Sequence, residues 1–323
     1  MLAYYVHDLS PFLIRFSESV GVRWYGLAYV LAFVFTFLML RRFSARGYLA
    51  IKPDRVPDFV TFVAVFGVML GGRLGHFLIY NREGFLSDPM SFFRIWQGGM
   101  ASHGGIAGIV LFTAYYAWRH RLSWPGIGDN LVVPAPFGIG LGRLANFING
   151  ELYGRAWTGK WAMQFPMELF EDSPETDEKR LALMREFQCD GATLNGIVEQ
   201  SRGGMTPEVH DAFAEVLTPR HPSQLYQALM EGFLLFALLY FLRVRFPRLG
   251  HGILTGVFFI GYAVARIIGE VFREPDSALV LGITKGQFYS ALMIPVGAAF
   301  LIYGFTVGKK QAARQAAAQE PAR

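Results

Sequence analysis

Polar and ionisable side chains interrupt the apolar stretches of this sequence, where they are costly and therefore indicate function. Arg143 and Arg266 lie about two helical turns inside such stretches, and Arg73, His103 and Tyr25 lie near the ends of three others. A guanidinium keeps its charge in almost any environment and binds phosphate through paired hydrogen bonds. Histidine exchanges a proton near neutral pH. These residue types predict an anion site with an acid or base, and a phospholipid headgroup is the anion expected at that depth.

Two carboxylates accompany the arginines. Glu270 follows Arg266 by four residues, so both lie on one face of a helix, and Arg273 lies one further turn along. Glu270 either holds Arg266 in position or neutralises it, and an ion pair that only fixes helix packing gives the same pattern. Glu231, in the middle of another apolar stretch, is interpreted as a partner for one of the arginines rather than as a proton carrier.

Glycine-rich segments surround the same residues, at 70–77, 98–108 and 140–155. Glycine allows close helix packing and also lets a backbone approach a ligand, so both interpretations stay open. The sequence has no P-loop, HExxH or GxSxG motif. The single cysteine, Cys189, has no partner for a disulfide and no histidine nearby in sequence. We therefore predict no metal ion, no cofactor and no nucleophile supplied by the protein.

The elements that must position these residues are membrane-spanning helices. Of the 323 residues, 53% are hydrophobic and only 17% charged, which is too apolar for an ordinary soluble domain. The net charge of +5 reflects loop placement rather than nucleic-acid binding in such a chain. The N-terminal residues lack the pattern of a cleaved signal peptide, so the first helix is expected to remain as an anchor.

Seven stretches are long and apolar enough to span a bilayer, which needs about 20 helical residues. They lie at 20–40, 57–80, 97–118, 129–149, 222–242, 252–272 and 286–307. The loops on one side are much richer in lysine and arginine, at 41–55, 119–121, 243–248 and 309–323. By the positive-inside rule these loops are cytoplasmic. The sequence thus predicts an all-α integral membrane protein of about seven helices, with its N-terminus outside and its C-terminus in the cytoplasm.

The connection at about 150–221 is predicted to form a small external cap between the fourth and fifth spans. Within it, 168–190 has helical spacing of apolar residues, and 207–217 is expected to form another short helix. Residues 1–310 are predicted to form a single transmembrane catalytic domain. The remaining residues, 311–323, are rich in alanine and glutamine and are expected to be a disordered cytoplasmic tail.

The segment GRLANFINGELYGR at 142–155 closely resembles the signature of prolipoprotein diacylglyceryl transferases, the bacterial enzymes that lipidate lipoprotein precursors. Other blocks resemble the family in the expected order: WYGLAY at 24–29, GGRLGHFLIYN at 71–81, RIWQGGMASHGG at 94–105, RHPSQLYQALMEG at 220–232 and GYAVARIIGEVFREPD at 261–276. Ala145 and Ile106 stand where glycine and leucine are usual. The segment 157–218 is the least similar to the family.

The resemblance implies transfer of an sn-1,2-diacylglyceryl group from phosphatidylglycerol to the lipobox cysteine thiol of a prolipoprotein, forming a thioether and releasing glycerol phosphate. This is the first step of bacterial lipoprotein maturation. The resemblance also implies a multi-pass protein of the bacterial inner membrane whose active site faces the outer leaflet. Its implied partners are phosphatidylglycerol, prolipoprotein signal peptides and membrane lipids. The attacking thiol belongs to the substrate, which agrees with the lack of an enzyme nucleophile.

By resemblance, Arg143 and Arg266 are assigned to the phosphate and the leaving group. His103 is the candidate base for the incoming thiol or, alternatively, a group that positions the lipid. The resemblance implies that further residues shape or support the headgroup site, namely Tyr25, Gly104, Asn146, Glu151, Gly154, Glu270 and Arg273.

Two other classes of function remain as alternatives. A lipid or anion transporter would use the same arginines, but alternating access would need polar residues in the cytoplasmic half of the membrane as well. A noncatalytic membrane scaffold for lipoprotein precursors would leave the buried arginines without a function, so that mutating them would be harmless. Another phospholipid-dependent transferase fits the chemistry, although the sequence blocks argue against it.

Overall fold

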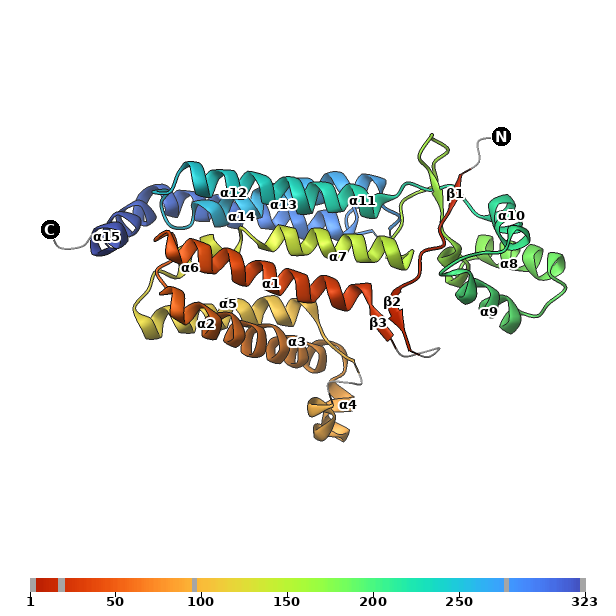
Figure 1. Ribbon diagram of the computed structural model, residues 1–323, viewed down its shortest axis with the longest axis horizontal. Helices are drawn as coiled ribbons and strands as arrows, with labels where there is room; N and C mark the ends of the chain where they lie inside the picture. Colours follow the sequence, from red (N-terminus) through yellow and green to blue (C-terminus); the bar gives the residue numbers. More distant parts are fainter. Residues whose placement is uncertain (1–3, 17–20, 95–97, 276–278, 320–323) are drawn as a thin grey trace. The chain divides into compact units, whose positions relative to one another are not determined.

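The computed structural model describes residues 4–16, 21–94, 98–275 and 279–319, and these are mostly helical (Figure 1). The strands are β1 (Tyr5–Val6), β2 (Phe12–Arg15), β3 (Gly21–Arg23) and β4 (Met163–Gln164). The α-helices are α1 (Trp24–Ala45), α2 (Val56–Phe62), α3 (Leu70–Gly75), α4 (Arg82–Ser87), α5 (Ser102–His120), α6 (Trp124–Leu131), α7 (Ala135–Asn149), α8 (Pro174–Glu186), α9 (Gly191–Ser201), α10 (Pro207–Val216), α11 (Ser223–Gln227), α12 (Leu235–Arg245), α13 (Ile253–Phe272), α14 (Lys285–Tyr303) and α15 (Lys309–Gln319). Short 3₁₀-helices cover Pro53–Arg55, Pro89–Phe93 and Pro166–Phe170. π-helical turns cover Val63–Met69, His76–Tyr80, Ala228–Leu234 and Gly304–Gly308.

Within the described residues, 6 helical stretches are long and apolar enough to cross a membrane: Trp24–Ala45, Pro53–Tyr80, Trp124–Asn149, Ser223–Arg245, Ile253–Phe272 and Lys285–Ala317. They coincide with all but one of the predicted stretches, and they confirm a mostly helical membrane protein. The exception, 97–118, begins outside the described residues and otherwise corresponds to α5. α5 opens with Ser-His-Gly-Gly, which makes its first turn less apolar, and the seven-span count stays a prediction.

The chain packs into two compact units. The first contains residues 1–33, 135–238 and 258–296, and the second contains residues 34–134, 239–257 and 297–323. The predicted arginines and carboxylates fall in the first unit, apart from Arg73, which belongs to the second together with His103. The single catalytic domain expected over 1–310 stays a prediction.

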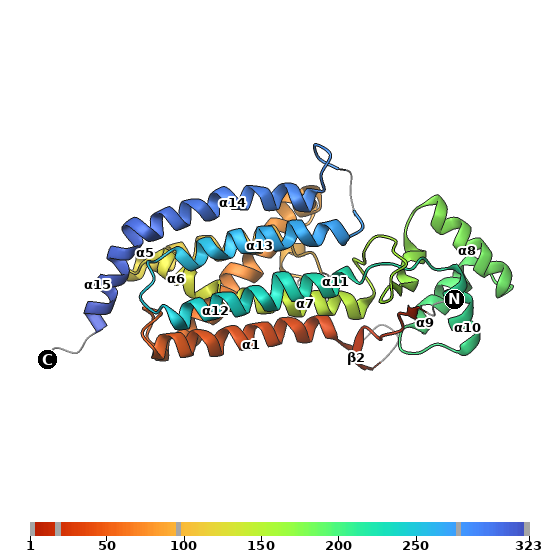
Figure 2. The same cartoon turned by 90° about the horizontal axis from the view of Figure 1, so that it is seen from above.

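In the first unit, α7 packs against α11 and the π-helical turn Ala228–Leu234 that continues it (Figures 1 and 2). Two glycines allow this approach, because a Cβ on Gly232 would lie 2.5 Å from the Cα of Gly140. Gly140 precedes Arg143 by one turn, and Gly232 directly follows Glu231. The close helix packing therefore brings Arg143 and Glu231 together. The π-helical turn that carries Glu231 is a type of element often found at functional sites.

The segment predicted as a cap has a hydrophobic core of its own in the first unit. Figure 1 shows α8, α9 and α10 gathered beside β1, which pairs in parallel with β4. The buried core residues are Val6, Leu169, Leu183, Leu194, Val198, Phe213 and Leu217. The helix predicted at 207–217 is confirmed by α10, and α8 lies within the predicted 168–190. Cys189 packs against this core, which gives it a structural role.

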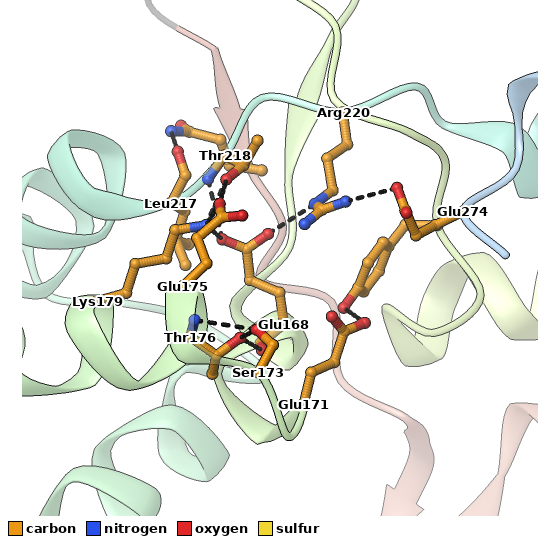
Figure 3. Close-up of polar contacts among 12 residues, drawn as sticks. Glu168, Glu171, Ser173, Glu175, Thr176, Lys179, Leu217, Thr218, Arg220 and Glu274 are labelled. Carbon is orange, nitrogen blue, oxygen red and sulfur yellow. Dashed lines mark hydrogen bonds and ion pairs between the residues drawn. The ribbon is translucent and has the colours of Figure 1, made fainter. Parts of the chain in front are cut away.

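A buried glutamate connects several segments of this cap (Figure 3). Glu168 accepts hydrogen bonds from Arg220 Nε at 2.7 Å, from Lys179 Nζ at 2.9 Å and from the Thr218 N–H at 2.9 Å. Only 1% of its side chain is exposed, and the donors stabilise its charge. Arg220 Nη1 also lies 3.3 Å from Glu274 Oε2, just beyond α13. The network therefore joins the cap to the end of α13.

The stability of the protein is expected to fall between about pH 6.5 and pH 4 because of His7, which is buried against the Phe147 and Phe165 rings. Burial lowers the pKa of His7 from 6.5 to about 4. Between pH 6.5 and pH 4 the His7 imidazole is protonated in the unfolded chain but stays neutral in the folded protein. The free energy of unfolding that is present above pH 6.5 is therefore lost as the pH falls. The loss amounts to about 3 kcal/mol.

Thermal unfolding in detergent across this pH range tests the prediction. His7→Leu should flatten the dependence, whereas His210→Gln, which alters an exposed histidine, should leave it unchanged. An unaltered pH dependence in His7→Leu would contradict it.

In the second unit, glycines let α5 pack closely against α3 and against the π-helical turn Val63–Met69 that precedes α3. A Cβ on Gly104 would lie 2.3 Å from the carbonyl oxygen of Gly71 and 2.7 Å from the Cα of Gly75. A Cβ on Gly108 would lie 2.2 Å from the carbonyl oxygen of Gly67. Such distances exclude any side chain, so the helix-packing interpretation of these glycine-rich segments is confirmed.

The C-terminal segment is helical as far as the structure describes it. α15 covers Lys309–Gln319 and is built from alanine, glutamine and basic residues, which all favour a helix. Residues 320–323 lie outside the described residues. The disordered tail expected at 311–323 stays a prediction.

Candidate functional site

Five charged side chains of the first unit form one connected cluster. Glu231 lies between two arginines, with Oε2 3.0 Å from Arg143 Nη2 and Oε1 3.4 Å from Arg266 Nη1. Glu270 extends the cluster, because its Oε1 lies 2.6 Å from Arg266 Nη2 and 3.7 Å from Arg273 Nη1. The predicted pairing of Glu231 with an arginine is confirmed, as is the contact between Glu270 and Arg266. We call these five residues the charge cluster.

The carboxylates of the charge cluster are more deeply buried than two of its guanidiniums. Glu231 is 0% exposed, whereas Arg143 is 16% and Arg266 13% exposed. A buried carboxylate needs a paired cation to offset its lost hydration, so each glutamate fixes the arginines around it. A guanidinium has five N–H donors, so pairing of this kind does not exhaust it. Three guanidiniums and two carboxylates leave the cluster with a net charge of +1, which suits a monoanion.

α14 and the residue before it hold Glu270 in place. Thr284 Oγ1 donates a hydrogen bond to Glu270 Oε2 at 2.8 Å. A Cβ on Gly286 would lie 2.6 Å from the carboxyl carbon of Glu270, so a side chain at this position would displace the carboxylate. Neither residue was predicted from the sequence, because neither is ionisable and no motif includes them.

Three other predicted residues form a hydrogen-bonded chain in the same unit. Asn146 Nδ2 donates to Glu151 Oε1 at 2.8 Å and lies 3.3 Å from Tyr25 Oη. Asn149 Nδ2 also donates to Glu151 Oε1, at 3.3 Å. Asn146 is buried and lies on α7, three residues after Arg143. The structure therefore brings together Tyr25, Asn146 and Glu151, whose role in a headgroup site stays a prediction from the resemblance.

Gly154 joins two other chain segments. Its N–H donates to the His221 carbonyl at 2.9 Å, and it forms a β-bridge with Arg273. A Cβ at this position would lie 2.5 Å from the carbonyl oxygens of both His221 and Phe272. Any side chain would push this segment away from the end of α13, and would move Arg273 with it.

The remaining predicted residues belong to the second unit. His103 is exposed in the first turn of α5, and Gly104 follows it, packed against α3. Neither is part of the charge cluster. Arg73 is 4% exposed and donates to the backbone carbonyls of Ser91, Phe92, Arg94, Gly98 and Gly99. Its guanidinium holds this loop, which corrects the prediction that Arg73 belongs to the anion site.

The fold defines a helical membrane protein, and the charge cluster places an excess of positive charge among the helices of its first unit. Among the residues that the structure describes, no group of three or more His, Cys, Asp or Glu side chains is arranged to hold a metal ion. The guanidinium groups of the charge cluster can stabilise negative charge, and His103, in the second unit, is of a residue type that transfers protons.

Comparison with known proteins identifies the family. Its description is prolipoprotein diacylglyceryl transferase, and its profile matches residues 11–303. Relatives named phosphatidylglycerol–prolipoprotein diacylglyceryl transferase include those of Bdellovibrio bacteriovorus (37% identical, 92% of this chain and 93% of the relative), Rhodospirillum centenum (38%, 91% and 91%) and Proteus mirabilis (37%, 92% and 92%). The chain belongs to the prolipoprotein diacylglyceryl transferase family.

Proposed function

We propose that the protein transfers the sn-1,2-diacylglyceryl group of phosphatidylglycerol to the lipobox cysteine thiol of a prolipoprotein, forming a thioether and releasing glycerol phosphate. The observation that carries the proposal is the charge cluster in a member of this family. Its net charge of +1 complements the single negative charge of a phosphodiester headgroup. The buried glutamates hold the guanidiniums in position before the lipid arrives, which reduces the cost of organising the site.

In this reaction the substrate sulfur attacks the glyceryl carbon that carries the phosphate ester. A carbon–sulfur bond forms, the carbon–oxygen bond breaks, and its electron pair stays on the phosphate oxygen. The phosphate gains negative charge as it leaves, and we assign Arg143 and Arg266 to stabilise that charge. A cysteine thiol has a pKa of about 8.5 and is mostly protonated at neutral pH, so a base must accept its proton.

The other predicted residues receive supporting roles in the proposal. Tyr25, Asn146 and Glu151 offer hydroxyl, amide and carboxylate groups that match the hydroxyls of a glycerol headgroup. Gly154 sets the position of Arg273 because its lack of a side chain lets the backbones at His221 and Phe272 pack against it. The roles of the remaining predicted residues follow from their contacts: Glu270 orients Arg266, Arg273 adds charge beside it, and Gly104 lets α5 carry His103 close to α3.

We also propose a topology of seven spans, with α5 as the third. The N-terminus and the cap at 150–221 lie outside, the C-terminus lies in the cytoplasm, and the active site faces the outer leaflet of the bacterial inner membrane. The distribution of lysine and arginine supports this orientation. So does the position of the charge cluster at the end of α13 that the cap contacts through Arg220 and Glu274.

A direct transfer assay tests the proposal. The purified protein in detergent is given phosphatidylglycerol and a peptide with a lipobox cysteine, and the thioether and glycerol phosphate are measured together. Equal amounts of both products are expected, with none from a peptide whose cysteine is replaced by serine. A folded protein that makes no thioether would refute the transferase proposal and would make lipid transport between vesicles the next activity to measure.

His103→Gln is expected to lower the transfer rate by about 10²–10⁴-fold, the usual contribution of a positioned acid or base. If His103 accepts the thiol proton, the variant should also lose an ionisation from the profile of log kcat/KM against pH. If the variant lowers the plateau and keeps that ionisation, His103 is not the base, and its role is to position the lipid. The pH profile of His103→Gln, compared with that of the wild type, therefore separates the base role from the lipid-positioning role, which the loss of rate alone cannot distinguish.

A further inference from the structure

A buried amide lies beside the charge cluster in the first unit. Gln227, the last residue of α11, is 1% exposed, and neither its Oε1 nor its Nε2 has a hydrogen-bond partner among the described residues. A Cβ on Gly269 of α13 would lie 3.6 Å from Gln227 Nε2 and 3.5 Å from Glu231 Oε1. Both atoms therefore lie next to the same point of α13, so the amide borders the carboxylate that holds Arg143 and Arg266.

An amide without partners is costly inside a membrane-spanning stretch, and Gln227 lies in the stretch Ser223–Arg245. Burial removes the water that would bind the amide, and a buried donor or acceptor that finds no other partner keeps the whole of that cost. In folded proteins nearly all such groups are therefore paired. Methionine has about the same shape as glutamine and would fill this position without the cost. The two amide atoms of Gln227 thus indicate a partner that the protein chain does not supply.

Gln227 belongs to a polar stripe that connects the two parts of the proposed headgroup site. Three residues before it, Gln224 is 0% exposed and donates from Nε2 to the Glu151 carbonyl at 2.8 Å, while its Oε1 has no partner among the described residues. Glu231 follows Gln227 by four residues. Residues three or four apart lie on one face of a helix. The stripe of Gln224, Gln227 and Glu231 therefore runs from the segment assigned to the headgroup hydroxyls to the arginines assigned to the phosphate.

We infer that the Gln227 amide binds the headgroup of the donor phospholipid and makes the site selective for a headgroup that carries hydroxyls. An amide offers Nε2 as a donor and Oε1 as an acceptor. A phosphate oxygen can accept from Nε2, but only a donor can satisfy Oε1, and in a glycerol headgroup that donor is a hydroxyl. A site whose buried polar groups pair with substrate hydroxyls discriminates against an analogue that lacks them. The inference rests on the proposed function and adds to it an uncharged residue that selects the lipid.

The test compares phosphatidylglycerol with phosphatidylmethanol, a lipid of the same charge that has no headgroup hydroxyl. Binding of each lipid to the purified full-length protein in detergent is measured without acceptor peptide, from the rise in unfolding temperature with lipid concentration. The wild type is expected to prefer phosphatidylglycerol, and Gln227→Met should lower that preference about ten-fold, because it loses a hydrogen-bonded hydroxyl. Without lipid, Gln227→Met should unfold at the same or a higher temperature, because it buries no unpartnered amide. Gln200→Met makes the same change at an exposed position of α9 and should alter neither quantity.

Several results would overturn the inference. A wild type that binds both lipids equally would do so whether or not the variant folds. A Gln227→Met protein that unfolds at a lower temperature and keeps the lipid preference would assign the amide to helix packing or to a bound water. A higher KM for the acceptor peptide in Gln227→Met, with unchanged lipid binding, would assign the amide to the peptide backbone. Because lipid binding is measured without acceptor peptide, a wild type that makes no thioether would refute the proposed function separately from this binding result.

Discussion

Replacing Arg143 or Arg266 with glutamine is expected to lower kcat/KM for thioether formation by about 10²–10³-fold, the usual effect of removing one donor that stabilises developing charge. Each guanidinium is anchored by the buried carboxylate of Glu231 and remains partly exposed. Either variant leaves Glu231 with one arginine partner, so the fold should survive. The loss of rate would then report on the leaving phosphate rather than on unfolding.

The measurement is the transfer assay at saturating acceptor peptide, with thermal unfolding of each variant alongside it. Arg143→Lys tests the chemistry further, because lysine keeps the charge but cannot form the paired hydrogen bonds of a guanidinium. It should recover only part of the lost rate. Arg248→Gln changes an exposed arginine and serves as the matched control. Folded glutamine variants that turn over as fast as the control would show that the charge cluster is not the catalytic anion site.

The membrane spans were predictable because hydropathy is summed over about 20 residues, so single polar residues do not hide the signal. That approach was weakest at α5, whose first turn contains serine, histidine and two glycines. The pair of Arg266 and Glu270 was also predictable, since residues four apart on one helix are neighbours whatever surrounds them. Local periodicity fixes contacts of this kind before any tertiary structure is known.

Contacts between helices were much less predictable. Glu231 was expected to meet one arginine, and it meets two. Gly140 and Gly232 let α7 bring Arg143 to the π-helical turn that carries Glu231, and α13 brings Arg266. Thr284 supports Glu270 from a position with no ionisable group to reveal it. Such contacts depend on the register between helices, which hydropathy does not encode.

For Arg73 the sequence predicted a role in the anion site, whereas the structure shows that its donors bind backbone carbonyls. An arginine in an apolar stretch indicates a functional site only if its charge is not needed locally, and the sequence does not show what its donors bind. Here the donors bind backbone carbonyls of the loop before α5. A rule based on residue type and depth therefore selected both the arginines of the charge cluster and an arginine that fixes a loop.

Glu231→Gln is expected to be strongly destabilising, by about 3–5 kcal/mol, because it leaves the Arg143 guanidinium without its carboxylate and removes one of the two carboxylates that contact Arg266. Glu231 is 0% exposed and contacts both Arg143 and Arg266, while Glu270 contacts only the second of these. The net charge of the cluster would rise from +1 to +2 without any compensating contact. The transition in thermal unfolding should shift to lower temperature, whereas Glu178→Gln, at an exposed position, should leave it unchanged.

The double variant Arg143→Met/Glu231→Gln separates charge balance from catalysis. Removing the arginine together with its carboxylate returns the cluster to +1, so the double variant should be more stable than Glu231→Gln alone. It should still be inactive, because the guanidinium assigned to the phosphate is missing. If the double variant were less stable than the single one, Arg143 would be held by contacts other than Glu231. Recovery of stability without recovery of transfer would show that Glu231 maintains the fold of the site and that Arg143 acts on the lipid.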